Sequence, residues 1–66
     1  MTTNEVIKAQ AEKVHNLTAE TLINTKRAIN ELQPGYDHHK IVALGYIEAL
    51  QNAIIDLKIS VRRIEQ

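Results

Sequence analysis

The chain has 66 residues, with eight basic and eight acidic side chains and no cysteine. A chain of this length forms one small domain, which buries only about 60% of the surface that its unfolded form exposes. Disulfides, a metal or oligomerisation usually stabilise such domains, and the lack of cysteine excludes disulfides and thiolate metal sites. The zero formal charge argues against binding of long DNA or RNA, which needs a basic surface.

No segment suggests secretion or membrane insertion. Residues 1–5 (Met-Thr-Thr-Asn-Glu) are polar and acidic, unlike a signal peptide. The most apolar stretch, residues 41–55, is too short to span a bilayer and contains Glu48. We therefore expect a soluble, cytoplasmic protein without a membrane partner.

The first predicted helix begins at Thr2 or Thr3, because Thr2 and Glu5 have the spacing of a capping box. Its middle is rich in threonine, and these side chains either lie at the edge of the apolar stripe or face a polar pocket. The stripe itself follows a spacing close to 3.6 residues. It consists of Ile7, Ala11, Val14, Leu17, Leu22, Thr25, Ile29 and Leu32.

Helix-breaking residues occur together only at 33–37 (Gln-Pro-Gly-Tyr-Asp). Proline lacks the amide that a helix interior needs, and glycine readily adopts turn conformations. The segment divides the chain into two halves of nearly equal length. We therefore predict an all-α fold, a single helical-hairpin domain over residues 1–66. Its helices cover about 3–32 and 38–65, run antiparallel and are joined by a turn at 33–37.

The start and the middle of the second predicted helix contain recognisable signals. Asp37 is the expected N-cap, because its carboxylate can accept amides of the first turn. Tyr36 and Ile41 have the spacing of a hydrophobic staple. Gly45 lies in the most apolar part of this helix, which indicates a close helix crossing or a ligand that approaches the backbone.

Apolar residues surround almost the whole circumference of the second helix. An ordinary surface helix buries a stripe roughly 100° wide, and one companion helix covers no more than that. We therefore predict that the hairpin assembles into a homo-oligomeric helical bundle and that any ligand site lies between subunits. The residues concerned are Ile41, Val42, Ala43, Leu44, Tyr46, Ile47, Ala49, Leu50, Ala53, Ile54, Ile55, Leu57, Ile59, Val61 and Ile64.

Catalytic patterns are not found in the sequence. There is no cysteine nucleophile, Ser60 is the only serine, and two glycines do not make a phosphate-binding loop. We predict a protein that is not an enzyme and needs no cofactor.

The histidines and tyrosines are candidate ligand-binding residues. His38 and His39 are adjacent on a helix, so their side chains diverge by about 100°, which disfavours a metal site. Residues 37–40 lie at a helix N-terminus, where amides and cations favour a phosphate; otherwise they are polar first-turn residues. His15 is either an interface histidine or a ligand donor. Tyr36 and Tyr46, the only aromatic rings besides the histidines, either stack on bases or pack the turn and an interface.

Residues 7–15 (Ile-Lys-Ala and the helix that follows) and 40–50 (Lys-Ile-Val-Ala-Leu-Gly-Tyr-Ile-Glu-Ala-Leu) resemble a known family. They are similar to the small phage proteins that sequester cyclic oligonucleotide signals, the anti-CBASS and related anti-Thoeris sponges. The resemblance implies an all-helical homohexamer that holds cyclic dinucleotides or trinucleotides between protomers without hydrolysis. Such a protein deprives a bacterial immune effector of its activator.

The resemblance also implies roles for individual residues. Lys8 would contact phosphate and His15 would be a polar contact in a dinucleotide pocket. Lys40 would be the nearest cation for a separate trinucleotide pocket. Gly45 stands where the family usually has threonine, and no aromatic residue precedes the first helix, so Tyr36 or Tyr46 of a neighbouring copy would supply the stacking ring. Together with His39 at the start of the second helix, Lys8, His15, Tyr36, Lys40 and Tyr46 are the predicted ligand-binding residues.

A second interpretation of the sequence is an interaction module. A dimeric four-helix bundle of the plasmid copy-control type has comparable length and packs by heptads. Such a bundle would inhibit a host protein or bind RNA. A hexamer is expected for the sponge, with a dimer or tetramer as the other assemblies.

Overall fold

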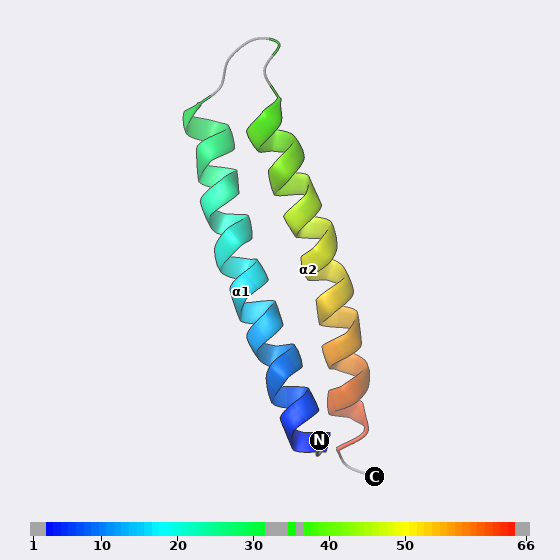
Figure 1. The fold of residues 1–66 in the computed structure, drawn as a ribbon. Helices are drawn as coiled ribbons and strands as arrows, with labels where there is room; N and C mark the ends of the chain where they lie inside the picture. Colours follow the sequence, from blue (N-terminus) through cyan, green and yellow to red (C-terminus); the bar gives the residue numbers. More distant parts are fainter. Residues whose placement is uncertain (1–2, 32–34, 36, 65–66) are drawn as a thin grey trace.

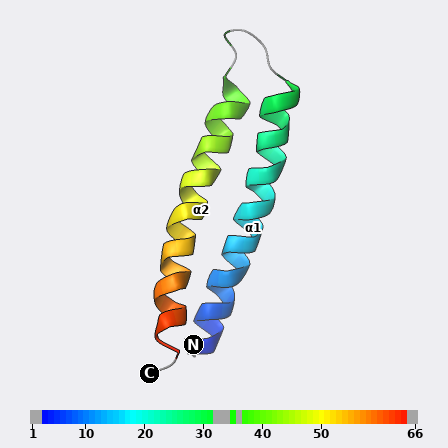
Figure 2. The same cartoon turned by 180° about the vertical axis from the view of Figure 1, so that it is seen from behind.

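The computed structural model describes residues 3–31, 35 and 37–64. Within these residues the chain forms two helices, α1 (Thr3–Asn30) and α2 (His38–Arg62). They pack side by side in opposite directions (Figure 1), and the view from behind shows the same pairing (Figure 2). The prediction of an all-helical hairpin is confirmed. We call the end where α1 begins and α2 ends the open end, and the other the hairpin end.

The start of α2 differs from the expected cap. Asp37 occupies the N-cap position, but its side chain makes no capping hydrogen bond. Its backbone ψ of 12° lies outside the extended region from which an N-cap side chain reaches the first amides. Its carbonyl still accepts the first helical hydrogen bond, from the amide of Ile41 at 2.9 Å. The predicted capping box at Thr2 and the staple at Tyr36 lie outside the described residues.

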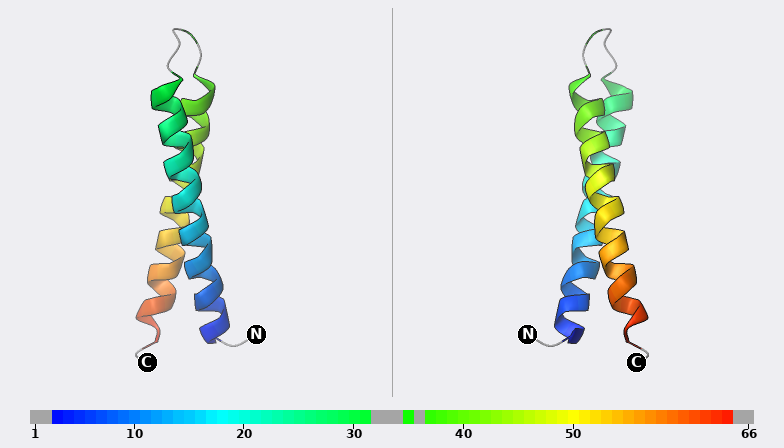
Figure 3. Two further views of the ribbon diagram at one scale, coloured as in Figure 1. Left: turned by 90° about the vertical axis from the view of Figure 1, so that its left-hand side faces the viewer. Right: turned by 90° about the vertical axis from the view of Figure 1, so that its right-hand side faces the viewer.

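The seam between the helices follows a seven-residue repeat, with buried and half-buried residues spaced alternately by three and four positions. This spacing is typical of coiled-coil packing, and Figure 3 shows the two helices crossing one another. The seam residues are Ile7, Gln10, Val14, Leu17, Thr21, Asn24 and Ala28 of α1, and His39, Ala43, Tyr46, Leu50, Ala53, Leu57 and Ser60 of α2.

The seam corrects the stripe that the sequence predicted for the first helix. Leu22 and Ile29 belong to that stripe, yet they are 54% and 63% exposed. A repeat of 3.5 residues places Thr21 and Asn24 in the seam instead. A stripe of period 3.6 drifts away from a straight partner over several turns, so the two patterns separate along α1.

Polar residues in the middle of α1 bond to their own helix. The Thr18 and Thr21 hydroxyls donate to the carbonyls of Val14 and Leu17, both at 2.7 Å. The Asn24 amide nitrogen donates to the carbonyl of Glu20 at 2.8 Å. These bonds satisfy the polar groups locally, which explains how Asn24 is tolerated at 6% exposure.

Only small residues and one asparagine are fully buried within the described part of the chain: Ala43, Ala53 and Asn24. Eleven large apolar side chains are exposed instead. They are Val6, Leu22, Ile23, Ile29, Ile41, Leu44, Ile54, Ile55, Ile59, Val61 and Ile64.

Neither helix has the length and apolar character needed to cross a membrane, as judged over the described residues.

Enlarging Ala53 tests the close packing of the seam. Ala53→Leu should destabilise the hairpin by about 1–3 kcal/mol, because the extra carbons have no space at a 5% exposed position. Urea unfolding followed by circular dichroism, at one fixed protein concentration, measures the change. Ala19→Leu is the control, since Ala19 is exposed. Equal effects of the two substitutions would contradict the described seam.

Gly45 does not mark a close crossing within the hairpin. The residue is exposed, and a Cβ atom placed there would meet nothing within 4 Å. Gly45→Ala should therefore raise the unfolding free energy by about 1 kcal/mol through helix propensity alone. Thermal and urea unfolding would measure it. A loss of stability would show instead that another molecule's backbone approaches this position.

Candidate functional site

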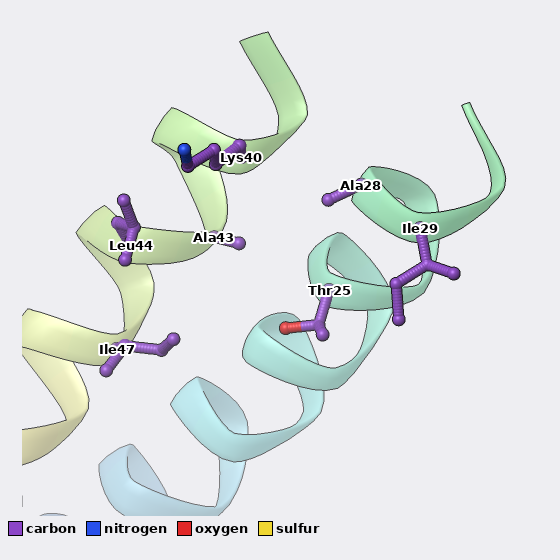
Figure 4. A pocket seen from close by; sticks show the side chains of 7 residues that line it. All are labelled: Thr25, Ala28, Ile29, Lys40, Ala43, Leu44 and Ile47. Atoms are coloured by element: carbon purple, nitrogen blue, oxygen red, sulfur yellow. The ribbon is translucent and has the colours of Figure 1, made fainter. Parts of the chain in front are cut away.

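An apolar groove lies between the helices near the hairpin end (Figure 4). It measures about 300 Å³. The small side chains of Ala28 and Ala43 form its floor, because they leave space where larger residues would meet, and Ile29 and Leu44 stand on either side. The groove residues are Thr25, Ala28 and Ile29 of α1, and Lys40, Ala43, Leu44 and Ile47 of α2.

The groove belongs to one long face of the hairpin. In a seven-residue repeat, positions seven apart lie on the same side of a helix, so steps of seven from the groove residues trace this face toward the open end. We call it the groove face. It comprises Lys8, Ala11, His15, Thr18, Leu22, Thr25 and Ile29 of α1, and Lys40, Leu44, Ile47, Gln51, Ile54, Lys58 and Val61 of α2.

The charges on the groove face are all positive. Lys8, Lys40 and Lys58 are exposed there, and none of the residues that define the face is acidic. Asp37, at the hairpin end before α2, is the nearest carboxylate in the same register. A face that combines apolar side chains with amines suits a ligand that has both flat apolar groups and negative charges.

The two outer edges of the hairpin have a different composition. We call the positions that point directly away from the seam the outer positions. They carry three acidic and two basic residues, whereas the charged residues of the groove face are all basic. The outer positions are Glu5, Glu12, Ala19 and Lys26 of α1, and Ile41, Glu48, Ile55 and Arg62 of α2.

A contact between two side chains at the hairpin end shows the register of the two helices. His39 Nε2 lies 2.5 Å from Glu31 Oε2, and Ala28 and Ala43 share the floor of the groove. When a residue of α1 and a residue of α2 lie at the same height along the hairpin, their numbers therefore add to about 70. By this rule Lys58 of α2 lies at the height of the α1 segment between Lys8 and His15. All three residues belong to the groove face.

The structure separates the predicted site residues into two groups. Lys8, His15 and Lys40 are exposed on the groove face. Lys8 and His15 are two helical turns apart, about 10 Å along the axis. Lys40 lies at the other end of the hairpin, so one chain does not bring it near Lys8. Lys58 is not among the predicted site residues; the signal that places it on this face is its spacing, seven residues from Gln51 and fourteen from Leu44.

The other candidates lie in the seam or outside the described residues. His39 pairs with Glu31, and its ring lies 5.4 Å from that of His38 in an edge-to-face arrangement. Tyr46 is half-buried between the helices, so its ring contributes to hairpin packing. Tyr36 lies outside the described residues. A stacking role for His39 or Tyr46 would require the ring to leave the seam.

Comparisons of the chain with protein-family models, with curated proteins and with solved structures gave no match.

Proposed function

We propose that this chain is a phage anti-defence protein that binds and sequesters cyclic oligonucleotide second messengers. Binding takes place in pockets between subunits, without hydrolysis, and blocks CBASS-type immune signalling. One observation carries the proposal: Lys8, His15 and Lys40, which the family resemblance points to, share the face that contains the apolar groove.

The chemistry of the groove face matches such a ligand. Each phosphodiester of a cyclic oligonucleotide carries a negative charge, and lysine amines bind phosphate oxygens through charge-assisted hydrogen bonds. The apolar sides of the groove, formed by Ile29 and Leu44, can contact the flat face of a base. Sequestration then depends on affinity and abundance alone, and it requires no reacting group.

An inter-subunit pocket follows from the shape of the groove face. A ligand site normally buries 70–90% or more of a small ligand, whereas a groove between two helices covers a ligand from one side. A second copy would cover the other side. The assembly expected for the sponge is a homohexamer.

The second candidate is a dimeric four-helix bundle that inhibits a host protein or binds RNA. The seven-residue repeat of exposed aliphatic residues on the groove face favours this function equally, because such a surface suits helix packing. The molecular mass in solution separates the two candidates: a hexamer supports the sponge, and a dimer supports the interaction module.

Isothermal titration calorimetry with a panel of cyclic dinucleotides and trinucleotides tests the proposal. At least one ligand should bind, and Lys8→Ala or Lys40→Ala should weaken it about ten- to one-hundred-fold, as expected for loss of one charge-assisted hydrogen bond. Lys26→Ala is the control, because Lys26 is an exposed lysine at an outer position and should leave binding unchanged.

The absence of heat with every ligand, at roughly tens of micromolar protein, would refute the sponge. Equal weakening by the Lys26 and Lys8 substitutions would show that general charge, and not the groove face, accounts for binding.

A further inference from the structure

The hairpin exposes more surface than a folded protein of its mass. Its accessible area is 5428 Å², compared with roughly 4,200 Å² expected for a compact protein of this size. Its radius of gyration is 15.3 Å, compared with about 11 Å for a compact domain of this length. The excess, about 1,200 Å², exceeds the roughly 800 Å² that each partner contributes to a standard protein interface.

The groove face carries five of the eleven large apolar residues that are exposed among the described residues: Leu22, Ile29, Leu44, Ile54 and Val61. On α2, the residues at successive seven-residue intervals, Ile47, Ile54 and Val61, are all aliphatic. Leu44 lies beside this row on the same face. At the outer positions of the same helix, isoleucines alternate with the charged residues Glu48 and Arg62. Large contiguous apolar patches on soluble proteins mark interaction sites, so the groove face is the better docking surface.

The shape of this face selects an orientation for the partner. It is hollow at the hairpin end, where Ala28 and Ala43 form the groove, and it has projecting aliphatic residues, Ile54 and Val61, toward the open end. Two copies that met hairpin end to hairpin end would place one hollow against the other and leave a void. Protein interfaces pack as densely as interiors, so the antiparallel arrangement is favoured.

We propose that a second copy of this chain packs on the groove face, antiparallel and related by a two-fold axis. Ile54 or Val61 of each copy then fills the groove of the other, and four helices form one bundle; in the proposed sponge this pair is the unit from which the homohexamer is assembled. This surface is the same on both copies, as a two-fold interface requires.

The arrangement brings together cations that one chain keeps apart. A two-fold axis near the middle of the face places Lys40 of the second copy opposite α2 near Lys58, at the height of Lys8 and at the end that also contains His15. The dimer thereby acquires two equivalent composite sites for a ligand with several phosphates. This part of the inference rests on the proposed function. Since clustered amines repel one another, an anionic ligand should strengthen the dimer, as linkage requires.

A matched pair of substitutions tests the docking face. Leu44 on the groove face and Ile55 at an outer position lie on the same helix and are 55% and 54% exposed. Leu44→Asp should yield monomers in a light-scattering dilution series, while Ile55→Asp should remain at least dimeric. Circular dichroism confirms that both variants are helical. A dimer or larger assembly of Leu44→Asp, together with monomers of Ile55→Asp, would overturn the assignment of the face.

Cross-linking tests the orientation, since the chain has no cysteine of its own. Lys8→Cys and Lys40→Cys are prepared separately, mixed and treated with a short bismaleimide. The antiparallel dimer predicts covalent dimers in the mixture and little product from Lys40→Cys alone. Strong self-linking of Lys40→Cys, without a product in the mixture that joins the two variants, would overturn it. Cross-linking as expected, without calorimetric binding of any cyclic oligonucleotide, would retain the docking surface and refute the proposed function.

Discussion

The close approach of α1 and α2 depends on small and polar side chains in the seam. Ala43 and Ala53 are nearly inaccessible, and the seam also buries Asn24, whose amide nitrogen donates a hydrogen bond to its own helix. Large aliphatic residues would hold the helices farther apart. Ile7, Val14, Leu17, Leu50 and Leu57 nevertheless belong to the seam, while eleven other large apolar residues of the described chain are exposed and give one hairpin an unusually apolar surface.

This arrangement connects the fold to the proposed function. Ala43, which is one of these small seam residues, also lines the groove together with Ala28, and the groove lies on the face that carries the amines of Lys8, Lys40 and Lys58. The groove, the exposed aliphatic residues and the three lysines therefore lie on the same side of the hairpin. In the assembly that we propose, a second copy that covers that side adds both stability and a ligand pocket.

Much of the fold could be predicted from local signals. Pro34 and Gly35 interrupt an otherwise helical sequence, and the observed helices end close to the expected positions. The site was predicted less completely. Lys8, His15 and Lys40 lie on one exposed face, but Tyr46 and His39 belong to the seam, and Lys58 was missed. These differences arise because the direction in which a side chain points, into the seam or away from it, depends on how the two helices align. The sequence of one helix alone does not determine that alignment.

The sequence by itself determined that two helices form, that they run antiparallel, and that their apolar surface exceeds what one hairpin can bury. Only the tertiary structure decided which residues meet. On a helix that is apolar almost all round, periodicity selects no single face. The choice instead depends on which side chains of the partner are small enough to permit close contact, as Ala28 and Ala43 do at the floor of the groove.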